Sequence, residues 1–255
     1  MTELIKVKNA SYVLYEELLM KRENLRKEGT QFYINYLQLF GELMTESFQK
    51  KIECIRKKKM IAFCQRCMNQ GKDINSIELN RYIQAEMATY EEELKQMAAD
   101  AKAAAQAKDI SLEDVRKIKE IYYRLARMIH PDMHPELAAD AKLQDYWNQI
   151  GIAYQNNQLS ELEDLEVMIT AYLENKDSGY GEIVIVDVEN KIKRIEQEIE
   201  RIINTKPYTY RFLLEDEGKR QEQKEALQNE IQEYTRYSHE LDDVLRSFPI
   251  KEMFA

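Results

Sequence analysis

The chain has 255 residues, of which 44% are hydrophobic and 33% are charged, with only 7 glycines and 4 prolines. So few turn-forming residues predict an all-α protein built mostly from long helices. The formal net charge of −9 argues against general nucleic-acid binding, because phosphate contacts need clustered cations. No run of about 18 apolar residues is present, so we expect no membrane span. Three cysteines and an N-terminus without a secretion signal are typical of a cytoplasmic protein.

Residues 1–107 are expected to form an N-terminal helical region. A first helix is predicted over 11–28, with apolar side chains on one side. Gly29 is a typical residue just beyond a helix end, and Thr30 can cap the helix that follows. A further helix begins near Ser76 and leads into an alanine-rich stretch, which has strong helix propensity but few large side chains to pack.

Two groups of residues in this region are candidate ligand sites. A basic cluster has two interpretations, a solvated helix face or a surface for an anionic partner. It consists of Lys50, Lys51, Arg56, Lys57, Lys58 and Lys59. Cys64 and Cys67 form a single CxxC pair with Cys54 nearby, whereas a structural zinc site needs four ligands. We therefore expect buried or partly buried thiols and no metal site.

Residues 108–175 are expected to form a helical hairpin with a short additional helix. Ser111 is a typical N-cap for a helix that runs to about Met128, and a second helix follows over about 138–156. Apolar residues recur at helical spacing as Val115, Ile118, Tyr122, Leu125 and Ile129 in the first helix, and as Leu143, Trp147, Ile150 and Tyr154 in the second. Two striped helices with a short connection should pack antiparallel.

The connection between these helices contains His130, Pro131 and Asp132. Pro131 lacks a backbone N–H and pushes the preceding residue out of helical geometry, so the helix should end there. Asp132 then carries a carboxylate on a stiff corner, suited to a charge-assisted hydrogen bond with an arginine of a partner. The basic residues that support this corner on the preceding helix are Lys119, Arg124 and Arg127. Such a basic face can steer an acidic partner surface and fix its register.

Residues 182–255 are expected to form an antiparallel coiled-coil hairpin. The β-branched run at 183–186 fits either a strand or the start of a helix. From Val188 the apolar residues follow a heptad, and a second apolar stretch comes after Gly218. The tip of the hairpin would carry Tyr208, Tyr210, Phe212 and Leu213. The hairpin is either an architectural support or an arm for a client or partner. Its tip is either an exposed contact site or is buried against a second copy in a homodimer.

The segment 122–132 resembles the second helix and loop of a J-domain, the co-chaperone module of the DnaJ family. Residues 147–154, Trp-Asn-Gln-Ile-Gly-Ile-Ala-Tyr, resemble the third helix of that module. By this resemblance, the His130-Pro131-Asp132 corner and the basic face dock on a DnaK-class heat-shock ATPase and promote its ATP hydrolysis. The protein would bias the conformational equilibrium of its partner without doing chemistry itself, and it would need no cofactor.

The match covers about 112–157 and departs from the family pattern at several positions. Tyr123, Met128 and Met133 stand where a basic residue is common, and the alanine-rich stretch takes the place of the first helix. A second class of function is therefore open, a coiled-coil adaptor or structural protein that keeps the hairpin only as a scaffold. An exposed corner favours the co-chaperone, whereas burial of the corner favours the scaffold or an autoinhibited form. Motifs of serine hydrolases, phosphate loops and zinc proteases are absent, so we expect no enzyme.

Overall fold

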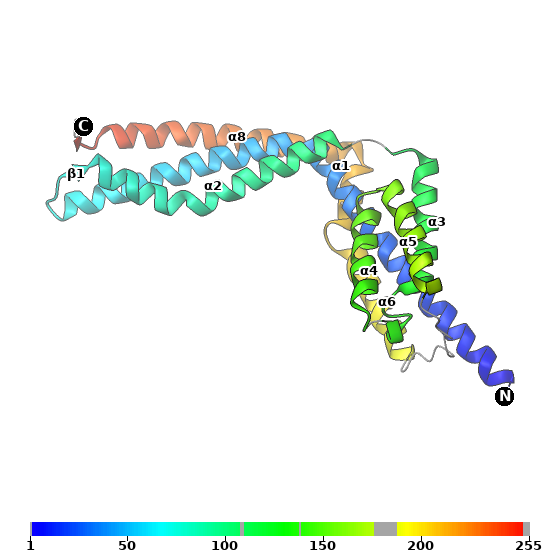
Figure 1. Cartoon of the computed structure of the whole chain (residues 1–255). Coiled ribbons are helices and arrows are strands. Elements are labelled where there is room, and N and C mark those ends of the chain that lie inside the picture. Colours follow the sequence, from blue (N-terminus) through cyan, green and yellow to red (C-terminus); the bar gives the residue numbers. More distant parts are fainter. Residues whose placement is uncertain (1, 108–109, 138, 176–187, 252–255) are drawn as a thin grey trace. The chain divides into compact units, whose positions relative to one another are not determined.

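The computed structural model describes residues 2–107, 110–137, 139–175 and 188–251, and the protein is all-α (Figure 1). The helices are α1 (Thr2–Asn69), α2 (Ser76–Gln106), α3 (Leu112–Ile129), α4 (Ala141–Gln155), α5 (Leu159–Asn175), α6 (Val188–Asn204), α7 (Arg211–Leu214) and α8 (Glu217–Arg246). Two short 3-10 helices are Pro135–Leu137 and Tyr208–Tyr210, and strands β1 (Ile74–Asn75) and β2 (Ile250–Lys251) form a two-residue parallel pair. No described helix combines the length and the hydrophobicity needed to cross a bilayer. The β-branched run at 183–186 lies outside the described residues.

α1 is a single helix of 68 residues, so the prediction that Gly29 ends a first helix is wrong. Gly29 is buried, and a Cβ atom added there would lie 3.4 Å from Cγ of Pro207 and 3.5 Å from the backbone nitrogen of Tyr208. The residue is small because another part of the chain lies against the helix at this point. The Thr30 hydroxyl donates to the carbonyl of Arg26 within the helix, at 3.1 Å, and does not cap a new one.

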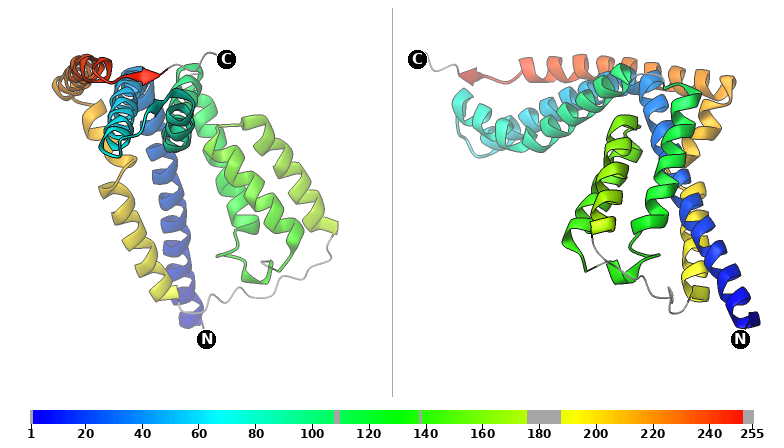
Figure 2. Two further views of the ribbon diagram at one scale, coloured as in Figure 1. Left: turned by 90° about the vertical axis from the view of Figure 1, so that its left-hand side faces the viewer. Right: turned by 45° about the vertical axis from the view of Figure 1, so that its right-hand side comes forward.

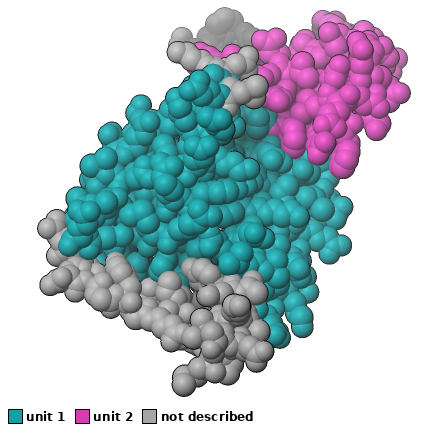
Figure 3. Space-filling model, turned by 90° about the vertical axis from the view of Figure 1, so that its right-hand side faces the viewer, with its two compact units in different colours: residues 1–31, 108–209 teal, residues 32–107, 210–255 magenta. Residues whose placement is uncertain are grey.

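The chain forms two compact units, and α1 contributes to both (Figure 3). Unit 1 contains residues 1–31 and 108–209, and unit 2 contains residues 32–107 and 210–255. The expected parts, 1–107, 108–175 and 182–255, follow the order of the chain, whereas the two units join segments that are distant in sequence. The expected C-terminal hairpin is divided between them, with α6 in unit 1 and α8 in unit 2.

The core of unit 1 lies where α3, α4 and α5 pack with the N-terminal part of α1 and with α6. Figure 2 shows this blue part of α1 alongside the yellow α6 and the green helices. The expected stripes of α3 and α4 are buried, apart from Val115, which is exposed, and Trp147, which is half-buried. α1 adds the fully buried Tyr15 and Leu19, and α6 adds Ile195. α6 buries the apolar residues of its heptad in this core. An apolar stripe specifies which face of a helix is buried, but it does not specify the partner helix.

Unit 2 consists of the remaining part of α1 together with α2, α7, α8 and the two short strands. Most cations of the basic cluster on α1 are engaged within this unit. Arg56 pairs with Glu91 of α2 at 2.7 Å, and Lys57 pairs with Asp242 of α8, also at 2.7 Å. Lys59 makes a similar pair with α2. These ion pairs join α1 to α2 and to α8. The basic cluster therefore has a structural role on the surface of a helical bundle.

Gly41 and Gly151 offer a matched pair of substitutions inside helices. At Gly41 of α1, an added Cβ would lie 2.9 Å from Cβ of Ala101 in α2, whereas nothing lies within 4 Å of a Cβ added at Gly151 of α4. We expect Gly151→Ala to raise the free energy of unfolding by about 0.5–1 kcal/mol through helix propensity. We expect Gly41→Ala to lower it by about 1 kcal/mol, because separating α1 from α2 outweighs the gain in propensity. Urea unfolding followed by circular dichroism measures both, and a stabilised Gly41→Ala protein would contradict the close approach.

Candidate functional site

The candidate site is the corner formed by residues 130–132 directly after α3. The backbone of His130 has φ −59° and ψ 125°, outside the helical region, as expected for a residue that precedes proline. Its carbonyl accepts hydrogen bonds from the backbone N–H groups of Met133 and His134, at 2.9 and 2.8 Å. The corner is therefore a hydrogen-bonded turn, and this turn fixes the direction of Asp132.

The His130 imidazole is only 5% exposed. Its ring centroid lies 4.5 Å from that of Trp147 in α4, and Nδ1 accepts a hydrogen bond from the backbone N–H of Asp132 at 3.0 Å. Burial lowers the pKa of His130 to about 4; the Asp132 carboxylate opposes this shift, and Arg22 and His134 reinforce it. The ring is therefore neutral at pH 7, where it packs in the core and accepts the hydrogen bond that shapes the turn.

Asp132 is half-buried, and its carboxylate makes no hydrogen bond or ion pair with any described residue. Close to it lies Tyr15 of α1, whose buried hydroxyl also lacks a hydrogen-bond partner within the described ranges. Burial, and then the negative charge of Asp132, raises the pKa of Tyr15 to about 12. The corner thus presents a carboxylate that is fixed by its backbone and has no ion-pair partner among the described residues.

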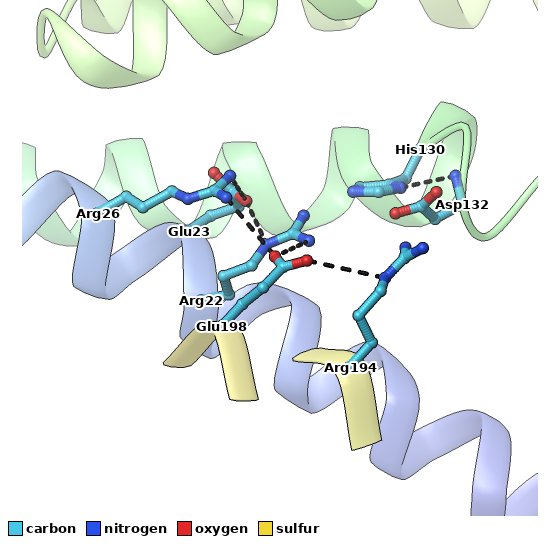
Figure 4. A network of polar contacts seen from close by, with 7 residues as sticks. All are labelled: Arg22, Glu23, Arg26, His130, Asp132, Arg194 and Glu198. Carbon is cyan, nitrogen blue, oxygen red and sulfur yellow. Dashed lines mark hydrogen bonds and ion pairs between the residues drawn. The ribbon is translucent and has the colours of Figure 1, made fainter. Parts of the chain in front are cut away.

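Charged residues of α1 and α6 extend beside this corner (Figure 4). This α1–α6 network consists of Arg22, Glu23, Arg26, Arg194 and Glu198. Arg22 pairs with Glu23 at 2.8 Å and with Glu198 of α6 at 3.1 Å. Glu198 also lies 3.6 Å from Arg26 and 3.7 Å from Arg194. Because the Arg22 side chain is only 11% exposed, breaking its pairs would leave a largely buried charge. The network therefore holds α6 on α1 next to His130.

The cations of the expected basic face have partners within unit 1. Arg124 donates two hydrogen bonds to the Glu166 carboxylate of α5, at 2.6 and 2.9 Å, and Arg127 pairs with Glu16 of α1. Lys119 lies over an aromatic ring of α3, 5.6 Å from its centroid. Arg124 and Arg127 are more than half exposed, whereas the side chains of their partners Glu166 and Glu16 are only 27% and 15% exposed. A partner carboxylate that takes over either arginine would therefore leave a partly buried carboxylate without its pair.

The three positions that depart from the J-domain pattern face the inside of unit 1. Met133 is fully buried, and Tyr123 and Met128 pack against the same core. The Tyr123 hydroxyl also accepts a hydrogen bond from the side chain of Asn24 in α1. Apolar and aromatic residues stand at these positions because a cation there would be partly or fully removed from water.

The part of α1 that completes the site was not identified from the sequence. The Tyr154 hydroxyl of α4 donates to the side chain of Asn24 at 2.6 Å, across 130 residues of sequence. Tyr15 and Arg22 reach the corner from the same helical segment. The apolar stripe predicted over 11–28 indicated that this helix packs against another part of the chain. It did not indicate which part.

The four residues expected at a hairpin tip do not form an exposed cluster. Tyr208 is buried, and Tyr210 stacks on Tyr36 of α1 with ring centroids 4.1 Å apart. Leu213 packs in the same apolar cluster as Tyr210, whereas Phe212 is 57% exposed. The expectation assumed a hairpin that projects into solvent, but side chains of other helices cover most of this connection.

The three cysteines are free thiols. Sγ of Cys54 donates to the carbonyl of Tyr234 in α8 at 3.2 Å, and burial raises the pKa of the Cys54 and Cys64 thiols. Within the described ranges, no three His, Cys, Asp or Glu residues are grouped so as to hold a metal ion. The described geometry of Cys54 and Cys64 is that of protonated thiols packed between helices.

Comparisons with protein-family models, with curated proteins and with solved structures gave no match for this chain. The resemblance to a J-domain therefore depends on the residues of α3, the corner and α4 themselves.

The buried, neutral His130 predicts a pH-dependent stability. Its folded-state pKa of about 4 lies below the ordinary value of 6.5, so the unfolded chain takes up a proton first as the pH falls. The stabilising contribution of the neutral His130 ring to the free energy of unfolding is fully present above about pH 6.5. We expect it to decline between about pH 6.5 and 4, by up to about 3 kcal/mol. Urea unfolding followed by the fluorescence of Trp147, the single tryptophan, measures this loss. The slope should be shallower in His130→Gln, and equal slopes would contradict the assignment.

Proposed function

We propose that the protein is a J-domain-type co-chaperone that docks on a DnaK-class heat-shock ATPase and stimulates its ATP hydrolysis. The observation that carries this proposal is the Asp132 carboxylate, which is fixed by a proline turn and has no partner among the described residues. On α3, the helix that leads into the corner, Arg124 and Arg127 are more than half exposed and are paired with Glu166 and Glu16. Such a corner can form charge-assisted hydrogen bonds with an arginine and with carboxylates of a partner. A cytoplasmic location fits this role and the three free thiols.

The proposal includes a covered resting state. His130 is buried, and the α1–α6 network lies next to it. Docking that uses the whole corner would require α6 to loosen from α1. The ATPase must then bind the open state more tightly than the closed one, by more than the free energy that separates the two states. The stability of the α1–α6 network would therefore set how strongly the protein stimulates the ATPase.

A coiled-coil adaptor or structural protein is the second candidate, and the burial of His130 against Trp147 favours it. In that case the hairpin of α3 and α4 is a scaffold, and the corner has no ATPase as its partner. The two candidates differ in what happens when the cover is weakened. An opened corner becomes more active in a co-chaperone and has no effect on the ATPase in an adaptor.

Asp132→Asn tests docking without disturbing the core, because the carboxylate has no partner among the described residues. The measurement is single-turnover ATP hydrolysis by a DnaK-class chaperone. We expect the wild-type protein to stimulate hydrolysis, and Asp132→Asn to lower the stimulation at least about tenfold through loss of a charge-assisted contact. Circular dichroism should show an unchanged fold. Equal stimulation by both proteins would show that Asp132 does not take part in docking.

Glu198→Lys tests the cover, because it places a further cation among Arg22, Arg26 and Arg194. We expect stimulation of the ATPase to rise about fivefold as α6 loosens. Glu196→Lys makes the same change of charge at an exposed position of the same helix and should leave the activity unchanged. An equal rise in both variants would contradict the cover. No stimulation by the wild type or by Glu198→Lys would support the adaptor instead.

A further inference from the structure

A surface groove between α4 and α5 has no role in the proposals above. Its lining residues are Gln149, Ile152, Glu161, Asp164, Leu165 and Met168. Leu165 is buried and forms an apolar floor, whereas Ile152 and Met168 are 60% and 50% exposed on the two sides. Large apolar side chains that gather around a groove, with polar groups at its rim, are typical of an interaction site.

The groove and the corner lie on different faces of α4. Tyr154 contacts α1 through its hydrogen bond to Asn24 at 2.6 Å. Ile152 precedes Tyr154 by two residues, which places the two side chains on nearly opposite sides of the helix. A ligand in the groove therefore leaves the contacts of the corner with α1 in place.

The groove lies along a strongly acidic helix. Residues Leu159–Asn175 of α5 include no lysine or arginine, and their acidic residues are Glu161, Glu163, Asp164, Glu166 and Glu174. Glu166 is paired with Arg124. Glu161 and Asp164, which line the groove, make no ion pair with a residue in the described ranges. Their charges are therefore available to a positively charged ligand.

We propose that this groove binds a cationic amphipathic helix of a partner protein. Nucleic acids and anionic membranes are excluded because unpaired carboxylates repel phosphate groups. An extended peptide is excluded because α4 and α5 use their backbone groups internally and offer no strand edge. A helix with apolar residues at i, i+3, i+4 and i+7 can place them between Ile152 and Met168. Its lysines or arginines then reach Glu161 and Asp164. The inference does not depend on the co-chaperone proposal, since it concerns a different surface.

The probe is a fluorescein-labelled peptide of leucine and lysine in an amphipathic pattern, about 14 residues or four helical turns long. Fluorescence anisotropy measures its binding to the full chain. We expect saturable binding that weakens at least about tenfold in Ile152→Ser/Met168→Ser, which removes the apolar walls. A similar weakening is expected in Glu161→Gln/Asp164→Asn, which removes the charges, and higher salt should weaken binding to the wild type.

Two matched controls separate the groove from the general surface. Val167→Ser removes an apolar side chain that is 71% exposed on α5 but does not line the groove. Glu233→Gln/Glu240→Gln removes two exposed carboxylates from α8. Both controls should bind the peptide within about twofold of the wild type. Equal weakening by the α8 control would show attraction to net charge alone and overturn the proposal. So would the absence of saturable binding, or binding that both groove variants leave unchanged.

Discussion

Residues 15–27 of α1 close the hairpin of α3 and α4, and the rest of unit 1 depends on this contact. Tyr122 and Tyr154 stack with ring centroids 3.9 Å apart. The pair needs a cover, because two antiparallel helices cannot bury wide apolar faces by themselves. α1 supplies this cover: Asn24 accepts a hydrogen bond from the Tyr154 hydroxyl, and Nζ of Lys27 lies 4.0 Å from its ring centroid. Burial lowers the pKa of Lys27 to about 8. The side chain of Lys27 is thus partly buried in the contact between α1 and the hairpin.

The contact with α1 divides the corner after α3 into a buried and an available part. His130 lies inside, where desolvation keeps the imidazole neutral. Asp132 follows on the same rigid turn, but its carboxylate remains without a partner among the described residues. Arg124 and Arg127 of the preceding helix are held by ion pairs with Glu166 and Glu16. A partner that engaged these arginines would have to replace their internal pairs, and the largely buried Arg22 would oppose opening of the corner.

Unit 1 also keeps the corner and the acidic groove on different surfaces. The corner has arginines of α3 nearby, whereas the groove on the far side of α4 is lined by carboxylates of α5. α4 connects the two, because its inner face contacts α1 and its outer face carries Ile152. The ATPase and the cationic helix that we propose as partners would therefore not compete for one surface. This arrangement suits a protein that brings two partners together.

The sequence alone was enough to predict the all-α fold, the apolar stripes of α3 and α4, and the end of α3 shortly before Pro131. Each of these depends on residues within a few turns of one another. It did not determine the packing partners. A glycine at position 29 fits either the end of a helix or a close approach of another segment, and the sequence does not distinguish the two. The heptad of α6 likewise fits against any helix with an apolar stripe. The burial of His130, and an Asp132 carboxylate without a partner among the described residues, are seen only in the folded chain. That outcome depends on Tyr15 and Arg22, which lie far away in the chain and meet the corner only after folding.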